Sequence, residues 1–199
     1  KMHIASMTKT LTAMAFLKIA QQKGLNTTDR IATYLPPAWP RGRGIDQITF
    51  GDLLTHRSGI VGLGSNCQNG SFTENVYSGL RQLIAKGVTT RGSYCYQNTN
   101  FGLFRVLIPS ILGYQFTGNE TTDAIETEKR YLAFLQLEIF EKAGVSNATI
   151  TFPAGNPTYT YNYPLSASQI GWNPGSFSQT LGGYGMYLTT LEAGRIYAT

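Results

Sequence analysis

Charged residues are scarce in this chain, and none of its apolar runs is long. Asp, Glu, Lys and Arg make up 14% of the 199 residues, against roughly 25% in an ordinary soluble domain. The net charge of +5 comes from scattered Lys and Arg residues that form no basic stripe, so we do not expect nucleic-acid binding. No stretch approaches the roughly 18 consecutive apolar residues that a transmembrane helix needs. The low charge has two interpretations: an apolar face that another part of the protein covers, or a neutral enzyme outside the cytoplasm.

Cysteine and histidine are equally sparse, with two of each. Cys67 and Cys95 are too few for a disulfide scaffold, and they lack the pairing and the histidines of a zinc site. Spacing alone does not decide whether they form one bridge, closing a long loop onto the region of Tyr96, or remain two thiols. Neither a metal nor an organic cofactor is implied by the sequence.

A serine and a lysine three residues apart, Ser6 and Lys9, stand near the start of an unusually apolar helix. Residues at that spacing share one face of a helix. Lys9 can therefore reach the Ser6 hydroxyl and take its proton, which would make the serine a nucleophile for acyl transfer. Alone the pattern is weak, because two fixed positions occur by chance about once in a chain of this size. A solvated lysine on the helix surface is the plain alternative.

The apolar periodicity predicts several helices and almost no strand pair. The first helix spans Thr8–Lys23, ends at Gly24 and is apolar on nearly all sides, which is typical of a buried helix. Further helices are expected at residues 48–55, 74–86, 101–112 and 126–143. Pro109 should kink or end the helix that contains it, and Thr190 should cap a last helix. Loops are expected at residues 118–123 and 149–178.

Four segments carry recognisable motifs in order along the chain: IASMTKTLTA at 4–13, ITFGDLLTHRSG at 48–59, YCYQNTNFGL at 94–103 and LGGYGMYLTT at 181–190. The first resembles the nucleophile segment of the serine β-lactamase and penicillin-binding protein superfamily, in its class C and D-alanyl-D-alanine carboxypeptidase branch. The others resemble that family's helix and turn before the second motif, its Tyr-x-Asn motif and its Gly-rich segment. Four ordered matches are far more specific than one tetrapeptide.

The resemblance implies an α/β (α+β) fold of the β-lactamase/transpeptidase type, with residues 1–199 as a single partial domain. The family's third motif, Lys-Thr-Gly or His-x-Gly on a late strand, does not occur here, and only five residues precede Ser6. We therefore expect mainly the helical portion of the domain, with most of the antiparallel sheet missing and that sheet region as its partner. Because the family is usually exported, the resemblance also implies a periplasmic or secreted location.

The resemblance further implies roles for five side chains. Ser6 would attack a carbonyl and form an acyl-enzyme, with Lys9 as the first candidate base and Tyr96 as the second proton carrier. Asn98 would orient Lys9 and hold the substrate's amide carbonyl, and Tyr184 would line the substrate cleft. The structural alternatives are a turn-forming asparagine and ordinary packing among the 12 tyrosines.

The expected activity is that of a serine hydrolase acting on a small-molecule or peptide substrate: a β-lactam, a D-alanyl peptide or an ester. No glutamate is identifiable for the deacylation water of class A enzymes, so a tyrosine-assisted class C type is the better match. In the family the second oxyanion donor comes from a strand beyond Thr199, so we expect the isolated chain to be nearly inactive. The alternatives are a non-catalytic homologue that binds ligands and a structural fragment that needs its missing sheet region. His56 is expected to be structural rather than a base.

Overall fold

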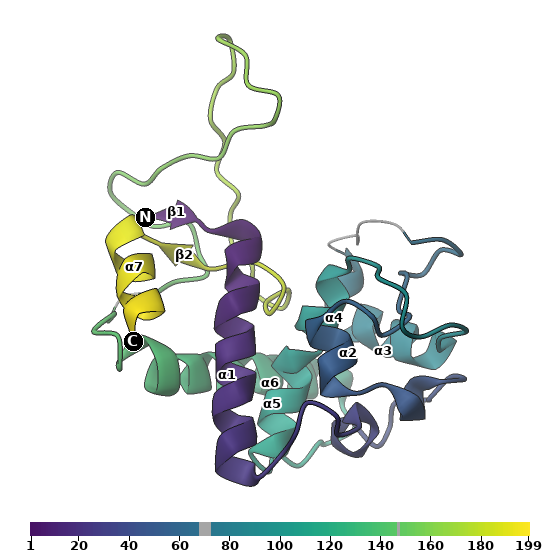
Figure 1. Cartoon of the computed structure of the whole chain (residues 1–199). Helices are drawn as coiled ribbons and strands as arrows, with labels where there is room; N and C mark the ends of the chain where they lie inside the picture. Colours follow the sequence, from purple (N-terminus) through teal and green to yellow (C-terminus); the bar gives the residue numbers. More distant parts are fainter. Residues whose placement is uncertain (68–72, 147) are drawn as a thin grey trace.

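The computed structural model describes residues 1–67, 73–146 and 148–199, and helices dominate this part of the chain (Figure 1). Helix α1 (Thr8–Lys23) stands near the middle and contacts α5 (Phe104–Ile111) and α6 (Glu120–Leu135). Helices α2 (Phe50–Leu54), α3 (Tyr77–Lys86) and α4 (Asn98–Gly102) lie to one side of it. Helix α7 (Thr190–Ala198) and both chain ends lie to the other. None of the described helices is long and apolar enough to cross a membrane.

Helix α1 has the predicted bounds, because Gly24 ends it in the left-handed conformation, with φ 68°. On its inner face Phe16 stacks on Phe50 with ring centroids 4.5 Å apart and packs at a tilt against Phe104 at 5.1 Å. The prediction that α1 is buried on nearly all sides is wrong for the side of the helix that carries Leu17. Leu17 is 53% exposed, because it faces an open hollow of about 340 Å³ that α7 borders on its far side.

The shorter helices follow the capping and stop signals in the sequence. Thr49 caps α2 through a capping box with Asp52, and α3 ends at Gly87 as predicted. The helix predicted at 101–112 is divided at Leu103 into α4 and α5, and Pro109 lies inside α5 instead of ending it. Single 3-10 turns form at Ala5–Met7, Ile31–Tyr34, Ile45–Gln47 and Thr73–Asn75.

The helices predicted from residues 48 and 74 begin at Phe50 and Tyr77. Two other predicted starts also need correction, and a side-chain cap explains each. Helix α6 begins at Glu120, before the predicted Glu126, because the Asn119 side chain accepts a hydrogen bond from the Thr122 N–H at 3.0 Å. The loop predicted at 118–123 is therefore mostly helix. A π-helical turn at Gln136–Phe140 follows α6. Helix α7 is capped by Thr189, one residue before the predicted Thr190.

Sheet structure is confined to one short pair within the described residues. Strand β1 (Met2–His3) runs antiparallel to β2 (Tyr187–Leu188), with Met2 opposite Leu188. The Ile4 N–H extends this pairing by donating to the Met186 carbonyl at 2.9 Å. The pair therefore ties the segment that carries Ser6 to the Gly-rich segment near the end of the chain.

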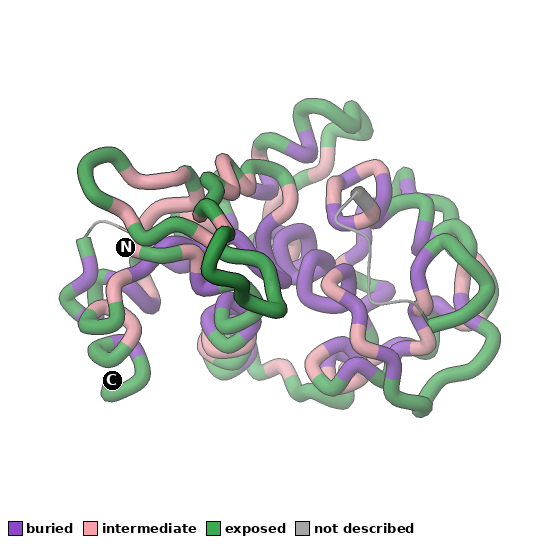
Figure 2. The backbone as a smooth tube through the Cα atoms, turned by 90° about the horizontal axis from the view of Figure 1, so that it is seen from above, coloured by how far each residue is buried: buried purple, intermediate pink, exposed green. Residues whose placement is uncertain are grey.

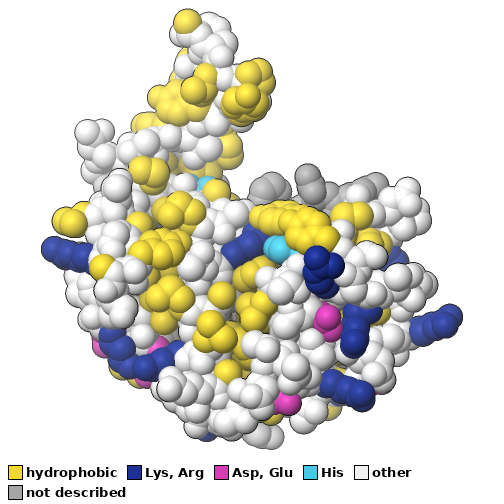
Figure 3. Space-filling model, viewed as in Figure 1, with side chains coloured by type: hydrophobic (Ala, Val, Ile, Leu, Met, Phe, Trp, Pro, Cys, Tyr) yellow, Lys and Arg dark blue, Asp and Glu magenta, His cyan; other side chains and the backbone are white. Residues whose placement is uncertain are grey.

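The loops predicted at 149–178 include a segment that projects from the body, which we call the arm (residues 160–172; Figures 1 and 2). Thr160 and Trp172 pair through their backbones at its base. No charged residue occurs between positions 143 and 191. Tyr163, Leu165 and Ile170 are 94%, 74% and 91% exposed, so the arm presents apolar side chains and no charge (Figure 3).

Candidate active site

Ser6 lies on an exposed turn directly before α1. Ala5, which precedes it, has φ 45°, a left-handed conformation that is uncommon for a residue other than glycine. The Ile4 N–H bonds to the Met186 carbonyl, and the Met7 N–H bonds to the Ile4 carbonyl at 3.0 Å. The backbone is therefore fixed on both sides of Ser6, which places its hydroxyl at the N-terminal end of a long helix.

Lys9 lies one turn further along α1 and is only 8% exposed. Its Nζ atom is 3.2 Å from Ser6 Oγ, 2.8 Å from Asn98 Oδ1 and 2.7 Å from the Gly183 carbonyl oxygen. Burial lowers the pKa of the Lys9 amine, and a hydrogen bond to the Tyr96 phenol and its charge oppose that shift in part. The spacing of Ser6 and Lys9 thus brings both groups into hydrogen-bond contact.

Tyr96 contacts both the serine and the lysine. Its Oη atom is 2.7 Å from Ser6 Oγ, and Lys9 Nζ lies 4.7 Å from the centre of its ring. The neighbouring Cys95 forms a disulfide with Cys67, which resolves the alternative that the sequence left open. The Cys95 N–H also donates to the His56 carbonyl at 2.8 Å, so Tyr96 extends from a segment held at two points.

His56 packs against Tyr96, and the hydrogen bonds of its ring go to Gln97 and Asn100 rather than to Ser6. Its ring packs against the Tyr96 ring at a centroid distance of 4.6 Å. Nδ1 accepts from the Gln97 N–H at 3.2 Å and lies 3.2 Å from the Asn100 amide nitrogen. Burial first, and the Lys9 charge second, lower the pKa of His56 to about 4. The neutral imidazole is thus a buried hydrogen-bond acceptor, which agrees with a structural histidine.

Asn98 and Tyr184 differ in their placement. Asn98 is the first residue of α4, half-buried, and its Oδ1 accepts from Lys9 as expected. Tyr184 is 3% exposed, and its ring packs edge-on against Phe177 at 5.6 Å. The structure therefore brings Ser6, Lys9, Tyr96 and Asn98 together and leaves the Tyr184 side chain in the interior. This burial does not support the cleft-lining role predicted for Tyr184.

Sequence reasoning missed the part played by the backbone next to Tyr184. The Gly183 carbonyl accepts from Lys9, and the Gly182 carbonyl accepts from Thr12 Oγ1 at 2.6 Å. A Cβ atom at Gly183 would lie 2.8 Å from the Asn98 carbonyl oxygen, and one at Gly182 would clash with the Phe101 carbonyl. The two adjacent glycines were the available signal, because glycine permits such close approach of two backbones.

Comparison with known proteins assigns the chain to a family. The family model described as Beta-lactamase matches residues 1–199. The chain belongs to the β-lactamase family. This result confirms the family that the four ordered motifs indicated. A curated relative, the putative penicillin-binding protein PbpX of Bacillus subtilis (strain 168), is 27% identical over 147 residues, which are 73% of this chain and 32% of the relative.

Solved structures confirm the β-lactamase/transpeptidase fold. FmtA from Staphylococcus aureus superposes with a TM-score of 0.68 at 16% identity, covering 99% of this chain and 51% of that one. The β-lactamase/D-alanine carboxypeptidase from Yersinia pestis gives 0.67 at 20% identity, with 98% and 52% covered. The chain thus spans about half the length of these β-lactamase-fold proteins and about a third of PbpX. It is mostly helical and holds little sheet, as expected.

Proposed function

We propose that this chain carries the nucleophile of a serine hydrolase that works through an acyl-enzyme on Ser6, with Lys9 as the base and Tyr96 as a proton carrier. The observation that supports this proposal is the position of Ser6 Oγ, 2.7 Å from Tyr96 Oη and 3.2 Å from Lys9 Nζ. Hydrogen-bond contact between a nucleophile and its base is the geometric requirement for this chemistry.

The contacts of Lys9 suit a neutral amine that accepts a proton. A neutral amine has two N–H donors and one lone pair. The Asn98 Oδ1 atom and the Gly183 carbonyl can only accept, so they take the two N–H groups. The lone pair is then free to accept from the Ser6 hydroxyl, which has a proton to give, as has the Tyr96 phenol that also bonds to Lys9. The lowered pKa of Lys9 increases the neutral fraction available for this step.

The proposed step keeps its atoms in balance. The Ser6 proton moves to Lys9 while Oγ bonds to the substrate carbonyl carbon, and the carbonyl π electrons move to its oxygen. When that intermediate collapses, the bond to the leaving group breaks, and the leaving group takes a proton from Tyr96, which recovers one from Lys9. Water then hydrolyses the ester on Ser6 and regenerates the serine.

The proposed substrates are carbonyl compounds of the kinds that the resemblance implied: a β-lactam, a D-alanyl peptide or an ester. The Ser6 N–H would supply one oxyanion donor. Because the chain spans about half the length of its structural neighbours, we propose that the second donor belongs to the sheet region of the full domain. Losing one donor costs about 10²–10³ in rate, so the 199-residue chain alone should be nearly inactive.

A periplasmic or secreted location remains part of the proposal. The bridge between Cys67 and Cys95 supports it, because disulfides form and persist mainly in oxidising compartments. Cell fractionation of the host, followed by reaction of each fraction with a thiol reagent before and after reduction, would test this: protein in the cytoplasmic fraction with thiols that label before reduction would contradict it.

Intact-mass spectrometry after incubation with a fluorescent penicillin, and separately with a fluorophosphonate, tests the proposed function. It should be run on the 199-residue chain and on a form extended at both ends by its encoded flanking sequence. We expect one adduct on Ser6 in the extended form, no adduct after Ser6→Ala, and little adduct in the short chain. A folded extended protein that neither probe labels would contradict the acyl-enzyme proposal and favour a ligand-binding homologue.

A further inference from the structure

Arg105, on α5, is among the largest fully buried side chains in the described part of the chain. It is 1% exposed. Its Nη2 donates to the Asn75 carbonyl at 3.0 Å, and its Nη1 lies 3.8 Å from Glu128 Oε2 on α6. Burial lowers the pKa of Arg105 to about 10, with Glu128 opposing this shift, so the guanidinium remains charged at neutral pH. A buried charge of this kind is costly unless its partners hold it.

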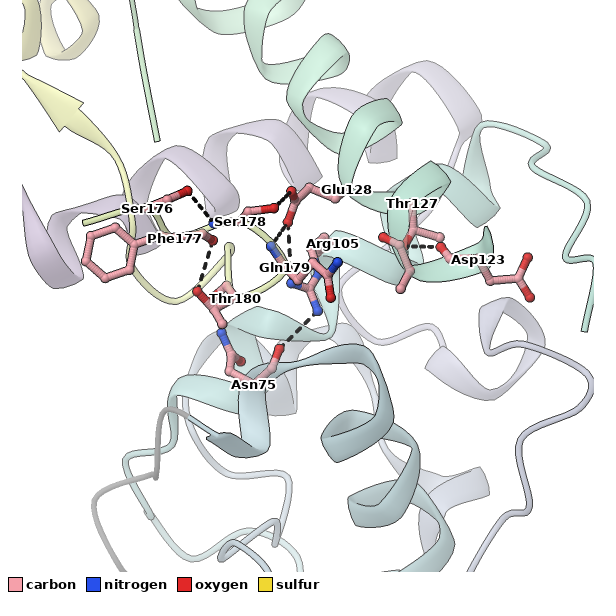
Figure 4. A network of polar contacts seen from close by, with 11 residues as sticks. Asn75, Arg105, Asp123, Thr127, Glu128, Ser176, Phe177, Ser178, Gln179 and Thr180 are labelled. Atoms are coloured by element: carbon pink, nitrogen blue, oxygen red, sulfur yellow. Dashed lines mark hydrogen bonds and ion pairs between the residues drawn. The ribbon is translucent and has the colours of Figure 1, made fainter. Parts of the chain in front are cut away.

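Both partners of Arg105 hold the same short segment, as Figure 4 shows. Glu128 Oε1 accepts from the Ser178 hydroxyl at 2.9 Å, and Glu128 Oε2 accepts from the Gln179 N–H. The Asn75 side chain donates to the Thr180 carbonyl. Ser178 and Gln179, although exposed, are thus fixed to Glu128 of the ion pair, and Thr180 is fixed to Asn75, whose carbonyl Arg105 holds.

The anchored segment leads directly to the Gly183 carbonyl that Lys9 contacts. We propose that the Arg105–Glu128 pair is a positioning device, which holds residues 178–180 so that the Gly183 carbonyl meets the Lys9 amine. This inference rests on the proposed role of Lys9 as the base. The alternative is that Thr12, which bonds to the Gly182 carbonyl, fixes the segment by itself and the ion pair serves only stability.

The charged and titratable neighbours of both groups are few. Tyr96 and His56 face Lys9. Besides Glu128, the phenols of Tyr77, Tyr131 and Tyr184 surround Arg105. Since the Gly183 carbonyl can only accept, it binds an ammonium more strongly than a neutral amine. A loosened carbonyl should therefore lower the pKa of Lys9 further.

The test is an NMR titration of the 199-residue chain with ¹³C-labelled lysine side chains, in which the Lys9 signal is assigned with Lys9→Arg. Glu128→Gln keeps the shape of the side chain and removes its charge. Ser178→Ala changes no charge, so any shift it causes reports position and not electrostatics. Leu83→Ala, in the core of α3, is the control that destabilises the fold without touching this segment.

We expect Glu128→Gln to lower the Lys9 titration midpoint by about half to one pH unit, Ser178→Ala to lower it by less, and Leu83→Ala to leave it unchanged. A folded Glu128→Gln protein with an unchanged midpoint overturns the proposal and favours Thr12 as the anchor. If Glu128→Gln does not fold, an unchanged midpoint in Ser178→Ala overturns it. The titration needs no turnover. Absence of Ser6 labelling would therefore refute the proposed function, but the Lys9 midpoint would still show whether the ion pair positions the Gly183 carbonyl.

Discussion

Adding one methyl group at Gly183 should disable the site without removing any side chain that contacts Ser6. An alanine Cβ would lie 2.8 Å from the Asn98 carbonyl oxygen and 3.2 Å from the Asn98 Cα and Cβ atoms. Ordinary contact begins at about 3.4 Å, so the two backbones must separate by several tenths of an ångström. Gly183 and Asn98 both accept from Lys9 at 2.8 Å or less, and the separation pulls at least one of them away.

The size of the effect follows from these two contacts. Lys9 becomes an ammonium as it takes the Ser6 proton, and a hydrogen bond to a charged group contributes about 1.5–3 kcal/mol. Loss of one such bond should therefore slow Ser6 labelling by roughly 10- to 150-fold. Overpacking should also cost about 1–3 kcal/mol of unfolding free energy. The labelling rate with fluorophosphonate, in the form extended at both ends, measures the first effect, and urea unfolding measures the second.

The matched control is Gly194→Ala. A Cβ atom at Gly194, inside α7, meets nothing within 4 Å, and this residue has no positive φ. Alanine there should stabilise the helix by up to about 1 kcal/mol and leave the labelling rate unchanged. If Ser6 in a folded Gly183→Ala protein is labelled as fast as in the unchanged protein, the Gly183 carbonyl is not needed to hold Lys9. That result would refute our account of the base.

Three further predictions concern the surroundings of the serine. Replacing both Cys67 and Cys95 by serine opens a loop of 28 residues and should cost about 3–4 kcal/mol of unfolding free energy; an equal urea midpoint would contradict this. Tyr96→Phe should slow Ser6 labelling by about 10²–10⁴-fold with little change in melting temperature, and unaltered labelling would leave Lys9 as the sole proton carrier. Because the pKa of His56 falls to about 4 on folding, protons bind the unfolded state first, so the unfolding free energy should decline as pH falls from about 6.5 to about 4. The decline should be smaller in a folded His56→Asn protein, and an equal decline would contradict the depressed pKa.

Local signals were enough for α1, which begins directly after the turn that carries Ser6, and for the first two members of the site. The bounds of α1 depend on an apolar run and on Gly24, both visible in the sequence, and three-residue spacing on a helix places Lys9 beside Ser6. The start of α6 was missed because Asn119 and the residues after it have the polar composition of a loop. Only the hydrogen bond to the Thr122 N–H shows that Asn119 is a cap.

Contacts between distant segments were beyond local signals. Tyr184 was assigned to the cleft from the motif around it, yet its buried ring packs against Phe177, and it is the Gly183 backbone carbonyl of that segment that Lys9 contacts. Every residue except proline has the same backbone donor and acceptor, so residue type cannot reveal which carbonyl a lysine will meet. Whether Cys67 and Cys95 form a bridge was likewise open until the fold placed them side by side.

The dependence of Lys9 on three separate segments explains why the site needs a folded domain rather than a short motif. Its contacts come from its own helix, from the start of α4 and from the Gly-rich segment. With fewer of these acceptors in place, burial would leave the amine neutral but free to turn its lone pair away from Ser6. In the proposed mechanism, the oxygens of Asn98 and Gly183 take the two N–H groups of Lys9, which leaves its lone pair for the hydroxyl. The tetrapeptide would thus supply the reacting groups, and the tertiary contacts of Asn98 and Gly183 would set the direction in which the proton moves.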